Sequence, residues 1–266
     1  MKSKIQVLIS TMNNTTDLLE RLNITTDAVV INQCSFSDKK ILNFCGHNVL
    51  WLDTPTRGLS ISRNLAIENS SADFLVIGDD DEVFSDDLEM TVETAFTAHP
   101  DMDVIAFQVH GIEDKFKDYC CNEYEISRMK SMQLSSVELC FRRRSLMEHH
   151  LRFNQSFGSG AQYKMGEENI FLFDCYRNNL RVYYIPRRIA WLHIGESTWF
   201  RGFNEKYFID RGATYYEMFG WLSVPMVLQF VVRKYRLFSH EISAFKAISH
   251  ALRGISQRRT EKKQDT

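Results

Sequence analysis

The chain has 266 residues, a formal net charge of −2, 44% hydrophobic residues and 25% charged residues. This length suits one large domain, or a domain with an appendage, and the composition is ordinary for a soluble globular protein. No uninterrupted apolar stretch reaches the roughly 18 residues of a membrane-spanning helix, and the apolar run within residues 1–10 is too short for a signal peptide. We therefore expect a cytoplasmic protein.

Charge is distributed unevenly along the chain. Residues 231–266 contain nine Lys and Arg against three acids, so this segment carries +6 and the preceding residues carry −8. Such an asymmetry predicts a basic C-terminal segment that meets an anionic surface.

The six cysteines show no CxxC spacing and no zinc-like pairing with histidines. In a chain of this length, that usage predicts reduced and mostly buried thiols, and hence a reducing compartment.

Four apolar runs in the first part of the chain have the length of strands that are buried on both faces. Helical and polar segments separate them, and strands that alternate with helices predict βαβ units in a largely parallel sheet. The predicted strands are 4–10, 27–31, 48–52 and 74–77. The predicted helices are a short one that begins near Asp17 and ends by Asn23, and a second over 59–69.

The second part of the chain continues the same alternation. Acidic residues at the start of a helix complement its dipole, as at Glu167 and Glu168. The elements predicted here are a helix over 86–99, strands over 102–109 and 137–142, a helix over 167–177, and strands over 181–185 and 189–194.

Three consecutive carboxylates, Asp79, Asp80 and Asp81, directly follow the strand over 74–77, with Glu82 behind them. Adjacent like charges repel one another, and a bound Mg²⁺ or Mn²⁺ relieves that repulsion, because hard oxygen ligands suit these cations. The carboxyl ends of parallel strands are also where open α/β sheets place their ligands. The alternative is a solvated acidic turn that caps the next helix.

Two arginines lie about one helix upstream of these carboxylates, in the segment RGLSISRN that starts at Arg57. Arginines beside a glycine at a helix N-terminus predict a docking site for a pyrophosphate or for the acidic strand end. The alternative is that Arg63 and Asn64 are structural and bond to neighbouring carbonyl or carboxylate groups.

Four motifs make the sequence resemble the family-2 glycosyltransferases of the GT-A fold. They are ISTMNN after the first predicted strand, RGLSISRNLAI, VIGDDDE in place of the family's DXD motif, and GEENIFLFDCYR, similar to the family's acidic "ED" segment. The resemblance covers roughly residues 4–215. It implies an α/β GT-A fold, in which a Rossmann-like, mostly parallel sheet is flanked by helices, with a nucleotide-sugar half over 1–100 and an acceptor half over 101–215.

The same resemblance assigns residues of the first strands to the nucleotide. Ser10, Thr11 and Asn13 would lie by the base and the ribose. Asn32 takes the place where the family commonly has an aspartate that contacts uracil or ribose. This departure leaves the identity of the nucleotide base open, although the resemblance as a whole implies a UDP-sugar donor.

The diphosphate and the metal are assigned in the same way. Arg63 would lie against the diphosphate or support the acidic loop, and Asp79 and Asp81 would flank the Mn²⁺ or Mg²⁺, with Asp81 as the direct ligand. If Gly78 instead occupies the family's first aspartate position, Asp80 becomes a ligand.

The implied reaction is sugar transfer from a nucleotide-sugar to a hydroxyl of a glycan or lipid-linked glycan acceptor. The leaving diphosphate requires charge stabilisation, and the acceptor hydroxyl requires a general base on the opposite side of the anomeric carbon. The resemblance indicates Glu168, or otherwise Glu167, as that base, with inversion at the anomeric centre. The alternative is that both acids only cap their helix.

Residues after the GEE segment supply further candidates. His193 follows an apolar strand, and it is either a late metal ligand or a buried structural side chain. Arg201 and Arg211 are candidates for a phosphate contact. The aromatic residues that we expect in the core or in the wall of an acceptor groove are Trp191, Trp199, Phe200 and Phe203.

The C-terminal segment, residues 216–266, is predicted to be an apolar and basic helical appendage. Its run over 218–232 is strongly apolar, and residues 242–255 place apolar side chains at helical spacing. Such a segment favours peripheral contact with an anionic membrane, at the inner face of the plasma membrane. The alternative is a helix packed on the catalytic domain with a disordered basic tail.

Two other functions remain open from the sequence, and we expect no nucleic-acid partner. A sugar nucleotidyltransferase also uses metal-bound carboxylates, but such enzymes usually open with a glycine-rich basic loop, which ISTMNNTTD lacks. The other alternative is a non-catalytic sugar-binding scaffold, against which the intact DDD and GEE segments argue.

Overall fold

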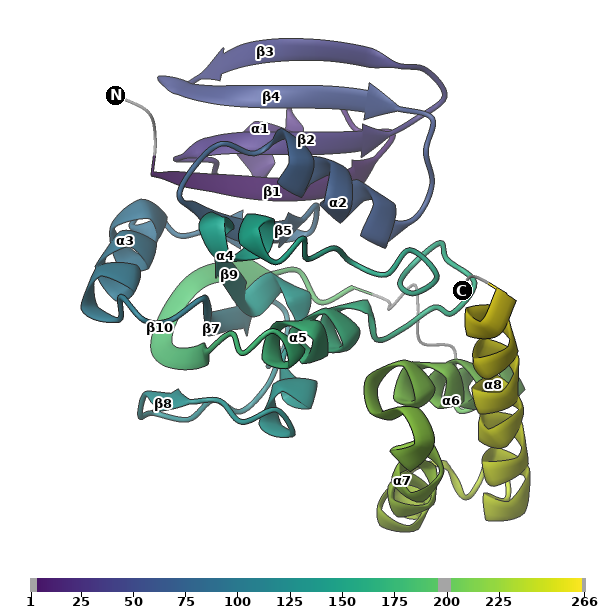
Figure 1. Ribbon diagram of the computed structural model, residues 1–266. Coiled ribbons are helices and arrows are strands. Elements are labelled where there is room, and N and C mark those ends of the chain that lie inside the picture. The colour runs from purple at the N-terminus through teal and green to yellow at the C-terminus, as the bar shows by residue number, and fades with distance from the viewer. Residues whose placement is uncertain (1–3, 196–201, 265–266) are drawn as a thin grey trace.

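The computed structural model describes residues 4–195 and 202–264, and within them ten strands form a single mixed sheet (Figure 1). The strand order is β3-β4-β2-β1-β5-β9-β7-β10-β6, with β8 paired to β10. The strands are β1 (Ile5–Met12), β2 (Asp27–Gln33), β3 (Asp38–Phe44), β4 (His47–Thr54), β5 (Phe74–Asp79), β6 (Glu82–Phe84), β7 (Val104–Gly111), β8 (Tyr124–Glu125), β9 (Leu139–Arg142) and β10 (Val182–Leu192).

Helices follow most of the strands. They are α1 (Leu18–Arg21), α2 (Leu59–Asn69), α3 (Leu88–Ala98), α4 (Arg143–Glu148), α5 (Glu167–Arg177), α6 (Glu205–Phe219), α7 (Ser223–Phe238) and α8 (Ala244–Gln264). Short 3₁₀ turns are η1 (Lys130–Gln133), η2 (Ser136–Glu138) and η3 (Gly220–Leu222). The bounds of α2 and α5 coincide with the helices expected over 59–69 and 167–177.

The N-terminal half of the sheet has the parallel arrangement that the sequence predicts. The strands β4, β2, β1 and β5 are parallel neighbours in that order. In the second half, β7 and β10 are parallel, but β9 lies antiparallel between β5 and β7. The sheet is therefore mixed, and the expectation of a mostly parallel sheet holds for β4, β2, β1 and β5.

Several strands differ from the prediction, which lacked the short strands β6 and β8 as well as β3. The sequence analysis did not identify β3, which is an edge strand with exposed and half-buried residues in alternation and so lacks a continuous apolar run. It forms a hairpin with β4 through Cys45 and Gly46, both at positive φ. The strands expected over 181–185 and 189–194 form one strand, β10, whose register against β7 shifts between Tyr184 and Ala190, around Pro186.

The sheet carries a hydrophobic core on each face, because successive side chains of a strand point to opposite sides. Along β1, Ile5, Val7 and Ile9 join the core that contains α1 and α3, whereas Leu8 joins the core that contains α2, α4 and α5. Strands covered on both faces need continuous apolar sequence, which explains the four runs that the sequence shows.

The helices α6, α7 and α8 form a separate cluster with its own core, at the lower right of Figure 1. The expected domain boundary at residue 215 falls inside α6, which contributes Tyr207, Phe208 and Tyr215 to this core while its other face packs on α5. We therefore propose that the helical appendage starts before Glu205.

The helix α8 packs against α6 through small residues rather than through the apolar stripe seen in the sequence. Its buried residues include Ala247, Ala251 and Gly254, while Phe245 and Leu252 are exposed. A Cβ on Gly254 would lie 2.0 Å from the carbonyl oxygen of Ile209, so the two helix backbones are in direct contact. The polar end of the chain is helical as far as Gln264.

Two further expectations can be compared with the described residues. None of the helices in residues 4–195 and 202–264 combines the length and the apolar content needed to cross a bilayer. All six cysteines are free thiols, as expected, but only Cys34, Cys140 and Cys175 are buried, so half rather than most of them are shielded from solvent.

The close crossing of α6 and α8 gives a stability prediction. We expect Gly254→Ala to lower the free energy of unfolding by about 2 kcal/mol, although alanine favours a helix by about 1 kcal/mol, because the methyl group has no space against the backbone of α6. Urea unfolding measures this change, with the exposed Ser256→Ala as the matched control. A Gly254→Ala protein as stable as the control would contradict the observed crossing.

Candidate active site

The carboxyl ends of β1, β2, β4 and β5 bring polar side chains into one row across the sheet. In the parallel register, Thr11 is opposite Asn32, Asn32 is opposite Asp53, and Ser10 is opposite Asp79. This is the edge at which open α/β sheets bind their ligands. The expected nucleotide residues and the expected acidic strand end are therefore neighbours in the fold.

Hydrogen bonds connect this row to the acidic turn. The Thr11 hydroxyl donates to Asp80 Oδ2 at 2.6 Å, and Asn14 Nδ2 donates to the same oxygen at 3.1 Å. Asn14 in turn exchanges two bonds with Asn32, from its backbone N to Asn32 Oδ1 and from Asn32 Nδ2 to its backbone O, each at 3.0 Å. The loop after β1 is thereby held against both β2 and the acidic turn.

A buried carboxylate closes this network at the end of β4. Asp53 Oδ1 accepts from Asn32 Nδ2 at 2.7 Å and from Trp51 Nε1 at 2.9 Å, and Lys40 lies 3.6 Å from Oδ2. Burial alone would raise the pKa of Asp53, but these donors and the Lys40 charge outweigh it and lower the pKa. Both amide hydrogens of Asn32 have protein acceptors, so its side chain is a structural connector.

Arg63 of α2 lies at the centre of the site and is only 1% exposed. Its Nη2 contacts both carboxylate oxygens of Asp79 at 3.2 Å and the Ser136 hydroxyl at 2.8 Å, and its Nη1 contacts Glu167 Oε1 at 3.2 Å. Burial would lower the pKa of Arg63, but the charges of Asp79 and Glu167 raise it above its ordinary value. Arg63 therefore joins the acidic strand end to the start of α5.

The start of α5 is fixed by Gly166, which has φ +86° and leaves no space for a Cβ beside Thr214. Glu167 and Glu168 follow it and, with Arg63 and Asp79, line a cleft of about 200 Å³. Burial and the neighbouring Glu167 charge raise the pKa of Glu168 to about 8. A carboxyl that titrates near neutral pH in a cleft is suited to proton transfer.

The acidic turn continues away from this cleft. Gly78 packs under Phe84, where a Cβ would lie 2.8 Å from the ring, so the first side chain of the turn is that of Asp79. Asp81 is exposed, but partial desolvation at the strand end together with the charges of Asp79 and Asp80 raises its pKa to about 6. The accumulated negative charge is the condition under which a cation binds.

The donor set of this turn fits a divalent cation that keeps other ligands. Among residues 4–195 and 202–264, the structure contains no group of three or more Asp, Glu, His or Cys side chains arranged to hold a metal. However, Mg²⁺ usually takes one or two carboxylates and completes its shell with water and substrate phosphate. The oxygens of Asp79 and Asp81 match that pattern.

Buried Glu82 supports the turn from below. One of its oxygens accepts the backbone N–H of Asp79 at 3.1 Å, and the other, Oε2, has no hydrogen-bond partner among the described residues. Burial and the adjacent Asp79 charge raise its pKa well above the ordinary value, which favours the neutral form. A neutral Glu82 adds no charge to the three aspartates.

Other expected site residues lie nearby but outside the cleft. The backbone N of His193 donates to the carbonyl of Asp81 at 2.8 Å, and its ring Nδ1 lies 2.6 Å from Glu113 Oε1. The exposed side chain of Arg57 donates to the backbone carbonyls of Cys34 and Thr56. Their assigned roles in metal and diphosphate binding stay predictions.

The remaining predicted site residues lie in different surroundings, and some of them lie outside the described part of the chain. Ser10 is buried and accepts from the Ser62 hydroxyl at 2.8 Å, whereas Asn13 is exposed with φ +51°. The Arg211 guanidinium lies 5.0 Å from the Phe230 ring centroid within the appendage, so it does not reach the cleft. Trp199, Phe200 and Arg201 lie outside the described residues.

Sequence reasoning missed several side chains of the site. Asn14 and Asp53 complete the hydrogen-bond network at the strand ends, and Ser136 and Lys164 line the cleft. Asn14 adjoins the selected Asn13, and Asp53 directly follows the strand predicted over 48–52, so the position of each in the sequence could have indicated it. Lys164 lies in the glycine-bearing loop over 157–166, where no spacing pattern distinguishes it.

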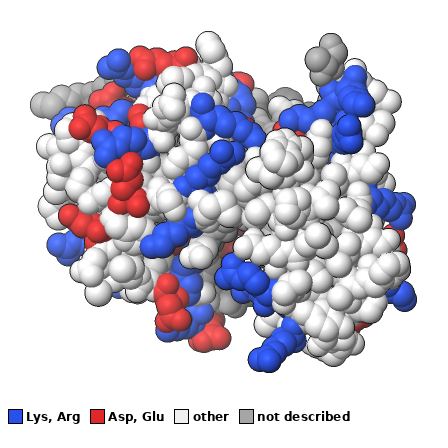
Figure 2. Space-filling model, turned by 60° about the horizontal axis from the view of Figure 1, so that its bottom comes forward, with Lys and Arg blue, Asp and Glu red and all other residues white. Residues whose placement is uncertain are grey.

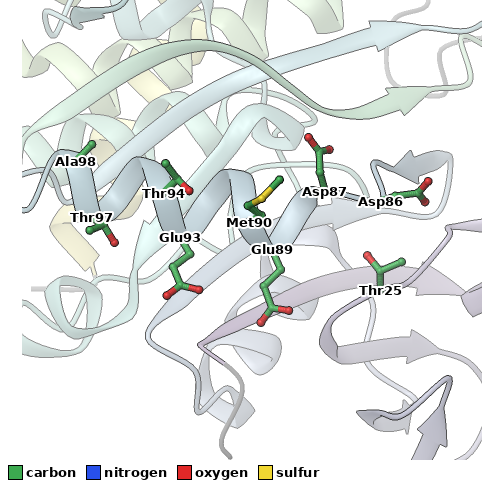
Figure 3. A pocket seen from close by; sticks show the side chains of 9 residues that line it. All are labelled: Thr25, Asp86, Asp87, Glu89, Met90, Glu93, Thr94, Thr97 and Ala98. Carbon is green, nitrogen blue, oxygen red and sulfur yellow. The ribbon is translucent and has the colours of Figure 1, made fainter.

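A larger concavity of about 900 Å³ lies along α3, outside this site (Figure 3). Its charged lining residues are all acidic, and Glu89 and Glu93 point to the same side of the helix. An anionic nucleotide-sugar would be repelled there, whereas the smaller cleft combines Arg63 and Lys164 with its carboxylates. The larger volume of the α3 concavity therefore does not make it the better candidate for the donor site.

Comparison with known proteins identifies the class to which this fold and site belong. The protein-family model described as Glycosyl transferase family 2 matches residues 8–147. The chain belongs to this family and is a glycosyltransferase, as the four motifs implied. No curated protein matches the chain.

Solved structures share its fold at low sequence identity. Residues 1–349 of S. aureus TarS in complex with UDP match with a TM-score of 0.64 and 14% identity, over 96% of this chain and 82% of that chain. The complex of TarS 1–349 with UDP-GlcNAc matches with a TM-score of 0.60 and 15% identity, over 90% and 74%. The mannosyltransferase PcManGT from Pyrobaculum calidifontis, in complex with GDP-Man and Mn²⁺, gives a TM-score of 0.51 and 10% identity, over 97% and 75%.

The position of Arg63 leads to a second prediction. We expect Arg63→Met to lower the free energy of unfolding by about 3 kcal/mol, because it leaves buried Glu167 and partly buried Asp79 without their common cationic partner. Urea unfolding measures the loss, and exposed Arg57→Met is the control.

A charge-balanced variant separates this cause from lost packing. Arg63→Met combined with Asp79→Asn and Glu167→Gln should recover much of the stability, since no carboxylate then lacks a cation. If the triple variant is no more stable than Arg63→Met, the loss comes from packing instead.

Proposed function

We propose that the protein is an inverting, metal-dependent glycosyltransferase that moves a sugar from a UDP-sugar to a hydroxyl of a glycan or lipid-linked glycan in surface-polysaccharide synthesis. The observation that carries this proposal is the cleft in which Asp79 from β5 and Glu167 and Glu168 from α5 meet around Arg63. Donor-side charge and a candidate base thus occur within one site, from two different elements.

The donor is inferred from the relatives. TarS has been solved with UDP and with UDP-GlcNAc, and PcManGT with GDP-Man and Mn²⁺. A nucleotide-sugar donor is consistent with all three. The higher TM-scores of the TarS complexes favour UDP, and the row of Thr11, Asn32 and Asp53 would lie below the nucleotide.

Asp79 and Asp81 would hold Mn²⁺ or Mg²⁺, with Asp80 kept in place by Thr11 and Asn14. The cation, when bound, supplies positive charge to the leaving diphosphate. Asp79 is shared with Arg63, so the guanidinium orients this carboxylate toward the cleft. Arg63 itself is buried, and it acts on the donor through Asp79 rather than by direct contact.

Glu168 is the proposed general base, with Glu167 as the alternative. Glu167 Oε1 already accepts a hydrogen bond from Arg63 Nη1 at 3.2 Å, so this carboxylate is engaged within the protein. Glu168 is the carboxyl whose pKa lies near 8. Its deprotonated form can accept the proton of the acceptor hydroxyl as the oxygen attacks opposite the leaving group.

The size of the cleft limits which part of the substrates it takes. At about 200 Å³, it is smaller than the roughly 300–1,000 Å³ of sites that enclose drug-sized ligands. It would receive the transferred sugar and the attacking hydroxyl, while the nucleotide lies along the strand ends. We also propose a cytoplasmic location at the inner face of the plasma membrane, where a lipid-linked acceptor is presented.

The proposed metal site can be tested by donor binding. We expect Asp81→Ala to weaken Mn²⁺-dependent UDP binding by about tenfold or more, because it removes an exposed oxygen ligand. Titration calorimetry with UDP, in Mn²⁺ and in EDTA, measures this effect, and EDTA should weaken binding of the unaltered protein similarly. Asp86→Ala, an acid on the α3 concavity, is the matched control. Equal Mn²⁺ dependence in the Asp81→Ala protein would place the metal elsewhere.

Glu168→Gln should preserve donor binding and reduce transfer by about 10²–10⁴-fold, the contribution typical of a general base. A panel of nucleotide-sugars, scored by nucleoside diphosphate release, identifies the donor for this assay. Because the base must be deprotonated, kcat/KM should rise with pH and level off above about 8, following the pKa of Glu168. Full transfer by Glu168→Gln would move the base to another residue.

A further inference from the structure

The outer face of η3 and α7 is apolar and open to solvent. Trp221 is 83% exposed and Val232 is 78% exposed. Val224, Leu228 and Tyr235 are also exposed and continue the same i, i+3/i+4 stripe along the helix. We call Trp221, Val224, Leu228, Val232 and Tyr235 the α7 stripe.

The packing of α7 within the appendage does not account for the α7 stripe. The adjoining face of the helix already buries Val227, Val231 and Phe238 in the core shared with α6 and α8. The α7 stripe extends this apolar surface beyond the part that the core covers, whereas a surface helix usually confines its apolar residues to the face that is covered. A contiguous exposed apolar surface of this kind marks an interaction site.

Charge around the α7 stripe indicates what covers it. Residues 218–260 contain seven Lys and Arg and one acid, Glu241. Arg233, Lys234 and Arg236 are exposed at the C-terminal end of α7. Figure 2 shows a broad uncharged surface on the side of the C-terminal helices, with Lys and Arg along its edges. The partner is therefore expected to combine an apolar interior with a negatively charged boundary.

We propose that the α7 stripe lies in the headgroup boundary of an anionic lipid bilayer, with α7 parallel to the membrane plane. The apolar side chains would enter the acyl region, Trp221 would sit at the boundary that tryptophan favours, and Arg233, Lys234 and Arg236 would contact lipid phosphates. The sixteen residues of α7 are fewer than the roughly 20 of a spanning helix, which agrees with a helix that lies on the surface.

A second copy of the chain fits this surface less well. A two-fold interface brings the same patch of both subunits together, so the basic residues at the edges of both stripes would be drawn near one another. Such like charges oppose association, whereas anionic lipid neutralises them. The charge distribution therefore favours the bilayer.

The anchor differs from the one that the sequence indicated. Arg258 and Lys262 near the chain end are engaged within the protein, since Arg258 Nε bonds Glu217 Oε2 at 2.8 Å and Lys262 Nζ lies 2.6 Å from Glu217 Oε1. These two side chains hold α8 against α6 within a helix, whereas the sequence indicated a basic tail. This inference does not depend on the proposed chemistry, because the α7 stripe shares no residue with the cleft.

The experiment compares vesicle binding of three forms of the full chain. The variant is Leu228→Glu with Val232→Glu, and the control is Ile41→Glu on β3, an exposed apolar residue (74%) on the far edge of the sheet. Each is sedimented with vesicles of phosphatidylcholine, with and without phosphatidylglycerol. We expect the unaltered chain and the control to bind phosphatidylglycerol vesicles, and the double variant to bind them about tenfold or more weakly.

Two measurements separate this proposal from other causes. Thermal unfolding by circular dichroism should show the same transition in all forms, and UDP binding should be unchanged, since the substituted positions are exposed. Arg233→Gln with Lys234→Gln should weaken binding to phosphatidylglycerol vesicles without removing the apolar side chains. If the protein proves not to use a nucleotide-sugar donor, the expected vesicle results stay the same.

Three outcomes would overturn the proposal. In the first, the unaltered chain does not sediment with phosphatidylglycerol vesicles, and in the second, the double variant binds them as strongly as the unaltered chain. In the third, analytical ultracentrifugation finds a dimer that Leu228→Glu with Val232→Glu dissociates while vesicle binding is absent, which would assign the α7 stripe to self-association.

Discussion

Arg63 occupies a position between carboxylates that would repel one another without it. Its guanidinium contacts Asp79 at the end of β5 and Glu167 at the start of α5, and it is almost fully buried. Such a cation is costly to desolvate, and it is retained only where several acceptors surround it. The end of β5 and the start of α5, which are 88 residues apart in sequence between Asp79 and Glu167, are joined by this one side chain, which contacts both carboxylates.

This arrangement also sets different properties for the acids. Glu167 is held by Arg63, and Glu168, one residue further along the helix, has a pKa raised by burial and by its charged neighbour. Asp80 is held by Thr11 and Asn14, whereas Asp81 extends to solvent. Adjacent residues of the same type are therefore distinguished by their partners, and partners of this kind are contributed by distant parts of the chain.

That dependence on distant partners explains what the sequence could predict. Continuous apolar runs located β1, β2, β4 and β5, and helical spacing located α2 and α5, because both signals are local. The strand β3 escaped because an edge strand needs no continuous apolar run. The motifs located Arg63, Asp79 and Glu168, but the roles of Asn14 and Asp53 arise only from neighbouring strand ends. The apolar spacing on α8 predicted its packing only in part, since Ile248 joins the helical core, whereas Phe245 and Leu252 are exposed and small residues make the closest contact with α6.

The loop over 157–166 forms one wall of the cleft and is secured from two sides. On the catalytic side, Ser60 Oγ donates to the Phe157 carbonyl and the N–H of Leu59 donates to the Ser159 carbonyl. On the other side, the Tyr163 hydroxyl donates to Glu261 Oε1 at 2.9 Å, near the end of α8. The last helix therefore supports a wall of the cleft from the far end of the chain, and a protein shortened to end near residue 215 would lose this support.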